Sequence, residues 1–171
     1  MPLRAVRFVA IVLTALVLVA TGAHLFEFPA KMALGRDEYF VVQESYRGWA
    51  FFGFALVGAI AANLILTVML YGRGVHFALT CMAFLLVTAV LAIFFAGAFP
   101  ANQETQNWTV IPSDWEELRR QWEYSHAINA LLILIAFSAL ALEAVLPESS
   151  AQRRPGAAAQ SIAQVEQGEA E

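Results

Sequence analysis

The stretch that decides the fold is SDWEELRRQWEYSHAINALLILIAFSALALEAVL, residues 113–146. Its later part, about 124–146, is an apolar run long enough to cross a hydrocarbon core about 30 Å thick as an α-helix. Ser113 followed three residues later by Glu116 predicts a capping box at a helix start. Because no glycine or proline follows until Pro147, we expect one helix about 50 Å long whose first turns project beyond the membrane.

Three more apolar segments precede it, at about 8–28, 48–72 and 75–99. The last two are joined by the turn 72–74, which is so short that they must be antiparallel neighbours. The chain is 60% hydrophobic and 14% charged, whereas soluble domains are about 45–50% apolar and about 25% charged. The sequence therefore predicts an all-α integral membrane protein, a four-helix bundle over residues 1–146, with a polar, disordered tail at 147–171.

Net charge and cysteine content exclude some classes of partner and of redox chemistry. The net charge of −4 argues against a nucleic-acid partner, and Cys81, the single cysteine, excludes an internal disulfide and a CxxC redox pair. Lipid is the expected surroundings. Lys and Arg counts tie between the two sides of the membrane. The N-terminal arginines and the 72–74 turn are nearly acid-free, however, which favours a multi-pass plasma-membrane protein with both termini in the cytoplasm.

The two long connections, 29–47 and 100–123, leave the bundle on the same side, predicted to be extracytoplasmic. In the first connection Pro29 is expected to end the first span. A new helix is predicted to start at 35–37 and to continue through Arg47 and Trp49 into the second span.

In the second connection Trp115, Arg119, Trp122 and His126 recur at helical spacing and form one stripe. Tryptophan and arginine also anchor helices at the membrane interface, which is the simpler interpretation of this stripe. That interpretation explains His126 and Glu123 less well. His76, at the opposite side of the membrane, is expected to be a plain interfacial histidine.

The outer ends of the spans bring together histidine and glutamate side chains, which can bind metals or transfer protons. His24 and Glu27 lie three residues apart on one helical face, as do Glu123 and His126, and the two pairs are expected at similar depth. Three interpretations stay open. The first is a metal site for iron, zinc or manganese formed by these four residues. The second is a ring of interfacial ion pairs, and the third is a metal-free polar pocket for a small molecule. The ion-pair interpretation matches Glu27 to Lys31, Glu44 to Arg47, and Glu123 to Arg119 or Arg120.

Two patterns carry a family resemblance. One is Asn102-Gln103-x-Thr105-x-Asn107-Trp108-Thr109, followed by Pro112-x-Asp114-Trp115-Glu116-x-Leu118-Arg119-x-x-Trp122-Glu123-x-x-His126-Ala127. The other is His24-Leu25-x-Glu27-x-Pro29-x-Lys31, followed by Tyr39 and Tyr46-Arg47-Gly48-Trp49. Together they resemble a family of small four-span membrane proteins, mostly uncharacterised, that includes the anthrone oxygenases. The resemblance covers all four spans and excludes the tail.

The resemblance implies an enzyme that oxidises a tricyclic anthrone to an anthraquinone with molecular oxygen and without a dedicated organic cofactor. His126, with Trp122 and Arg119, would then carry the reaction, and His24 would be a second base. The implied aromatic pocket for a lipophilic substrate is lined by Trp108, Trp115, Trp122, Tyr46 and Trp49. Most members have no demonstrated activity, and fold alone does not transfer a reaction. The alternatives are a non-enzymatic ligand-binding protein, homo-oligomer or complex subunit, and a metal-dependent oxidoreductase.

Overall fold

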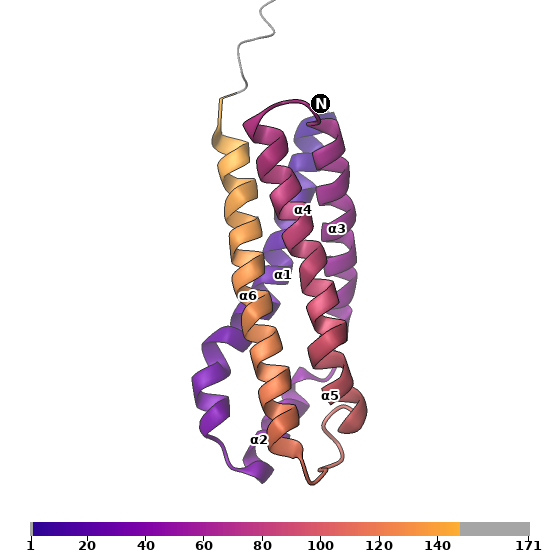
Figure 1. The fold of residues 1–171 in the computed structure, drawn as a ribbon, viewed down its shortest axis with the longest axis vertical. Coiled ribbons are helices and arrows are strands. Elements are labelled where there is room, and N and C mark those ends of the chain that lie inside the picture. The colour runs from indigo at the N-terminus through magenta and orange to yellow at the C-terminus, as the bar shows by residue number, and fades with distance from the viewer. Residues whose placement is uncertain (1, 148–171) are drawn as a thin grey trace, which may run out of the picture.

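The computed structural model describes residues 2–147, and this part of the chain is helical, with no strand. Four stretches are long and apolar enough to cross a membrane, which confirms the prediction of a helical, multi-pass membrane protein. The long helices lie side by side (Figure 1). They are α1 (Pro2–Ala33), α3 (Phe52–Met69), α4 (Val75–Ile93) and α6 (Trp115–Val145). Most of the tail predicted to be disordered, 148–171, lies outside the described residues.

The interior of the bundle is built from small and branched apolar side chains. α6 packs against α1 and α4, and α3 packs against the same two helices. Buried alanines on three of the helices, Ala10, Ala59 and Ala136, allow close approach of the backbones, as is common between helices in lipid. Phe54 and Val57 of α3 point outward and are more than half exposed, which suits a surface covered by lipid.

The connection between α3 and α4 is as tight as predicted. Gly72 and Gly74 both have positive φ, 75° and 56°, which glycine adopts without a steric penalty. The two helices are in contact along their length as antiparallel neighbours.

The connection between α1 and α3 differs from the prediction. α1 does not end at Pro29 but continues to Ala33, so Pro29 lies inside the helix, and Lys31 in the last turn forms an ion pair with α6. A short helix, α2 (Arg36–Gln43), then forms where predicted. It does not continue into α3, since Gly48 has φ 92° and a helix cannot pass through that conformation. Two single turns flank the break, η1 (Glu44–Tyr46) and η2 (Trp49–Phe51).

The second long connection also refines the predicted bounds. α4 runs through a π-helical segment, η3 (Phe94–Ala98), into α5 (Phe99–Glu104), so the third span is longer than 75–99. α6 is the uninterrupted helix expected from the sequence. The predicted capping box is wrong, because α6 starts one residue later than it requires. Asp114 is the N-cap, it makes no side-chain capping bond, and its carbonyl accepts the N–H groups of Glu117 and Leu118.

Candidate functional site

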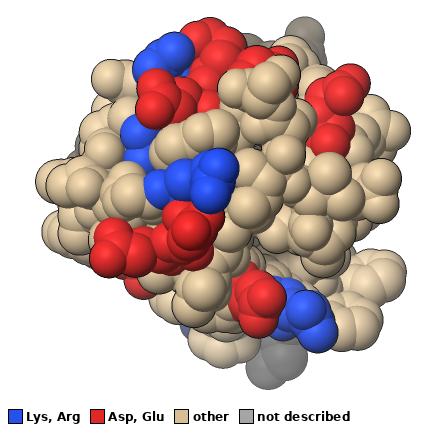
Figure 2. Space-filling model, turned by 90° about the horizontal axis from the view of Figure 1, so that it is seen from below, with Lys and Arg blue, Asp and Glu red and all other residues tan. Residues whose placement is uncertain are grey.

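Both long connections fold over one end of the bundle, which is the lower end in Figure 1. Seen from below, this end carries many of the acidic and basic side chains (Figure 2). α1 ends there and α6 begins there, so the two predicted His/Glu pairs come from helices that run in opposite directions and pack together.

The structure brings His24 and His126 together. Their ring centroids are 4.4 Å apart, and Trp122 contacts both rings, at 4.2 Å from His126 and 4.9 Å from His24. Tyr46 and Trp49 complete the group, with ring centroids 4.5 Å and 5.4 Å from that of His24. Nδ1 of His24 is buried and has no hydrogen-bond partner within residues 2–147. In this part of the chain, no protein group therefore occupies that imidazole nitrogen.

A buried ion pair lies beside the histidine pair and shares Trp122 with it as a neighbour. Nζ of Lys31 is 3.0 Å from Oε2 of Glu123, and the side chains of the two residues are 3% and 0% exposed. The hydroxyl of Tyr39 donates a hydrogen bond of 2.9 Å to the other oxygen of Glu123. Gln43 donates in turn to the hydroxyl of Tyr39. Because a buried carboxylate is costly unless it is paired, this network is what allows Glu123 to sit at the site.

Lys31 links the ion pair to the aromatic rings. Its ammonium lies 4.9 Å from the ring centroids of both Tyr46 and Trp122, within the range of a cation–π contact. The hydroxyl of Tyr46 donates a hydrogen bond to Glu27, which also lies 3.9 Å from Lys31. Burial, and next the neighbouring carboxylates, raise the pKa values of the Tyr39 and Tyr46 phenols well above their usual value. Both hydroxyls therefore remain protonated donors at neutral pH.

Arg119 does not join the histidine pair. Its guanidinium lies 4.7 Å from the ring centroid of Trp115 and 5.5 Å from that of Tyr39, and it donates a 2.9 Å hydrogen bond to the carbonyl of Leu34. These contacts tie α6 to the chain that leaves α1. The position of Arg119 is that of a structural residue which supports the network around Tyr39, and Trp115 belongs to the same outer layer.

Asn102 positions two of the predicted tryptophans. Its side-chain oxygen accepts hydrogen bonds from the indole N–H groups of Trp108, at 3.0 Å, and Trp122, at 2.9 Å. Three consecutive residues, 106–108, adopt positive φ, and the N–H of Trp108 donates to the hydroxyl of Thr105. Non-glycine residues with positive φ are uncommon and are held in place by surrounding contacts. Here they turn Trp108 inward against Trp122, with ring centroids 5.9 Å apart.

The predicted metal-ligand set is not assembled. Within residues 2–147, no three His, Cys, Asp or Glu side chains are grouped so that they could hold a metal ion. His24 and His126 meet, but Glu27 is bonded to Tyr46 and Glu123 to Lys31 and Tyr39.

The ion-pair interpretation matched Glu27 to Lys31, Glu44 to Arg47, and Glu123 to Arg119 or Arg120. The structure contains the first of these pairs, at 3.9 Å, but Glu123 pairs with Lys31, at 3.0 Å, and with neither arginine. Glu44 and Arg47 are exposed, and in the described part of the chain neither forms an ion pair. They lie at the break around η1 and Gly48, where water can solvate both charges.

A second buried carboxylate, missed by the sequence analysis, lies at the opposite end of the same two helices. Glu143 is 0% exposed and accepts two hydrogen bonds of 2.8 Å from Arg7. Nδ1 of His76 lies 3.0 Å from Oε1 of Glu143, so His76 is not the isolated interfacial residue that was expected. The segment of α6 between Glu123 and Glu143 is about 30 Å long, which matches the hydrocarbon thickness. α1 and α6 are thus joined by an ion pair at each end.

No family model, curated protein or solved structure matches this chain, so its function is argued from its own residues.

Proposed function

We propose that the protein is a membrane enzyme that oxidises an uncharged, lipophilic aromatic molecule with molecular oxygen, with His24 and His126 as its bases. The observation that carries the proposal is the buried histidine pair. Trp122 contacts both imidazoles, Tyr46 and Trp49 contact that of His24, and Nδ1 of His24 has no partner among the described residues. An imidazole nitrogen with no protein partner can accept a proton from a substrate, and the aromatic rings around it favour a flat, aromatic substrate.

The reaction balances without a further reductant. A histidine removes a proton from a methylene group that lies between two aromatic rings and is conjugated through them with a ketone, which leaves an enolate. The enolate passes one electron to oxygen, and the two radicals combine to form a carbon-bound hydroperoxide. The hydroperoxide loses water as a second C–H proton leaves, so that CH₂ and O₂ become C=O and H₂O. This reaction class is the one implied by the resemblance of residues 102–127 to the family that includes the anthrone oxygenases.

The proposal includes the side of the membrane. With both termini in the cytoplasm, the histidine pair lies at the extracytoplasmic boundary of the plasma membrane. The N-terminal arginines and the turn that contains Gly72 and Gly74 then lie inside. Lys and Arg counts tie between the two sides, and the scarcity of acidic residues in these segments is what favours this orientation.

One observation favours a second candidate, a non-enzymatic membrane component. The rings of His24, His126, Trp122, Tyr46 and Trp49 pack together with centroid distances of 4.2–5.8 Å. His24 is only 6% exposed, so the protein's own side chains fill most of the space around it. A ligand-binding protein or a subunit of a larger complex needs no reactive opening at this position.

The experiment that tests the proposal compares oxygen uptake with product formation. The full chain in mild detergent or lipid nanodiscs is given a tricyclic anthrone, and oxygen uptake, quinone absorbance and hydrogen peroxide are recorded together. We expect catalytic turnover with one O₂ consumed per quinone formed and no peroxide released. Rates no higher than those of empty nanodiscs would reject the oxygenase and leave the non-enzymatic component. Elemental mass spectrometry of the same sample tests the metal-dependent alternative, because stoichiometric iron, zinc or manganese would make metal chemistry the better account.

A further inference from the structure

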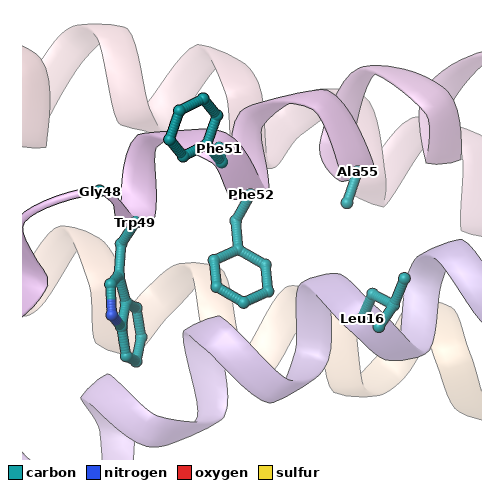
Figure 3. A pocket seen from close by; sticks show the side chains of 6 residues that line it. All are labelled: Leu16, Gly48, Trp49, Phe51, Phe52 and Ala55. Atoms are coloured by element: carbon teal, nitrogen blue, oxygen red, sulfur yellow. The ribbon is translucent and has the colours of Figure 1, made fainter.

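An open apolar groove runs along the outside of the bundle between α1 and the start of α3 (Figure 3). Its volume is about 280 Å³, close to the lower end of the roughly 300–1,000 Å³ that is usual for small-molecule sites. Phe51 and Leu16 are 74% and 44% exposed, so the groove opens on the surface that faces lipid. The lining residues are Leu16, Gly48, Trp49, Phe51, Phe52 and Ala55.

Trp49 belongs both to this groove and to the histidine site. Its ring lies at one end of the groove in Figure 3, and its centroid is 5.4 Å from the ring of His24 and 5.0 Å from the ring of Tyr46. Trp49 therefore lines the groove and also contacts the imidazole whose Nδ1 has no partner among the described residues. Gly48, with φ 92°, precedes Trp49 and separates its short turn from the helices on either side.

The residues that line the groove determine which class of ligand it can bind. All its side chains are apolar apart from the indole N–H of Trp49, so a charged or strongly polar molecule would lose its hydration without compensation. Three of the six lining residues are aromatic, and such rings pack well against another flat ring. A molecule of this kind dissolves in the bilayer and would meet the groove from the lipid side.

We infer that this groove is the lateral entrance and binding surface for the substrate of the histidine site. An uncharged aromatic molecule enters from the bilayer, lies along Leu16, Phe52 and Ala55, and reaches His24 when the ring of Trp49 turns aside. The inference rests on the proposed function for the fate of the bound molecule, but binding in the groove can be measured without turnover. Leu16 and Ala55, on opposite walls of the groove, are its size-determining residues.

The test fills the groove and measures binding. The probe is anthraquinone, which is flat, uncharged and stable in air, and its affinity is measured by quenching of tryptophan fluorescence in nanodiscs. Ala55→Phe places a ring in the groove, and Leu16→Phe does the same from the other wall in case the first variant folds poorly. Ala61→Phe is the matched control, because Ala61 is exposed on the same helix outside the groove. We expect affinity to fall about tenfold or more in both groove variants and to be unchanged in the control.

Three results would overturn the inference: no quenching in the wild type, equal affinity in all three variants, or labelling of the groove by a photoreactive phospholipid that anthraquinone does not displace. The last result would make the groove an ordinary lipid contact. The proposed function fails separately. If the groove variants lose binding while the wild type shows no turnover, the entrance is supported and the oxygenase is rejected. If the wild type shows turnover and the groove variants keep full binding, the oxygenase is supported and the entrance is rejected.

Discussion

The pair formed by Arg7 and Glu143 allows a sharp prediction about stability. Glu143 is 0% exposed and accepts both of its 2.8 Å hydrogen bonds from the guanidinium, so Arg7→Met leaves a buried carboxylate with His76 as its only other side-chain partner among the described residues. Removal of one partner of a buried ion pair typically costs about 3–5 kcal/mol. Since His76 remains 3.0 Å from the carboxylate, we expect the lower end of that range, about 3 kcal/mol.

Thermal unfolding in mild detergent, followed by circular dichroism, measures this loss. A cost of about 3 kcal/mol corresponds to a midpoint lowered by about 6–12 °C for a chain of this size. The double variant Arg7→Met/Glu143→Met should recover most of the loss, because replacement of a whole buried pair by apolar side chains is often neutral. Arg120→Met is the matched control, since Arg120 forms its ion pair with Glu117 in the exposed part of α6. A shift in Arg7→Met no larger than in this control, or a double variant as unstable as the single one, would refute the reasoning.

Three further predictions concern the end of the bundle that carries the histidines. Asn102→Leu removes the acceptor shared by two indole N–H groups and should cost about 2 kcal/mol in detergent unfolding, whereas Asn102→Asp should retain most of the stability; equal losses would contradict the shared bond. Gly97→Ala should destabilise the protein because a Cβ there would overlap Ser125, while Gly53→Ala, with no atom within 4 Å, should be neutral, and thermal midpoints decide between the two cases. Burial raises the pKa of Tyr39, so the folded state holds the phenol proton more tightly than the unfolded state, and stability should fall as the pH rises above about 10. In Tyr39→Phe, unfolding measured between pH 8 and pH 12 should show a shallower alkaline decline, and an unchanged decline would count against this role.

The features that sequence could predict are those set within one helix or by span length. The run from Trp115 to Val145 contains no glycine or proline, so the sequence predicted one uninterrupted helix there. The three-residue spacings of His24 and Glu27 and of Glu123 and His126 placed each pair on one helical face. Because spans of similar length alternate in direction, the two histidines were expected at similar depth. The 4.4 Å ring contact agrees with that expectation.

The features that sequence missed depend on contacts between distant elements. Glu143 lies at the end of an apolar run, and nothing in its neighbourhood indicates that α1 supplies Arg7 as its partner. Lys31 was matched to Glu27 on its own helix, and its pairing with Glu123 was not predicted because α1 was expected to end at Pro29. The inward turn of Trp108 requires three consecutive positive φ angles, for which residues 106–108 have no glycine to give a signal.

The burial of Tyr39 follows from the same folding back. A tyrosine in a short surface helix is ordinarily expected at the interface, yet α2 places this side chain at 0% exposure against Glu123. Tyr39 of α2 packs in one buried cluster with Trp122 of α6, beside the Lys31–Glu123 pair. The sequence does not predict this site, because it depends on the packing of α2 against the start of α6.

His24 and His126 are proposed to form the reactive site. The rate of quinone formation in three matched variants tests this directly. His24→Gln, His126→Gln and His76→Gln each replace a buried or half-buried histidine, but only the first two lie in the pair. Rates are divided by the amount of folded protein, so a loss of stability alone does not count as a loss of activity. The account predicts that the first two variants lose about a hundredfold or more, as is usual for removal of a general base, while His76→Gln retains the wild-type rate. Equal rates in all three variants would contradict it.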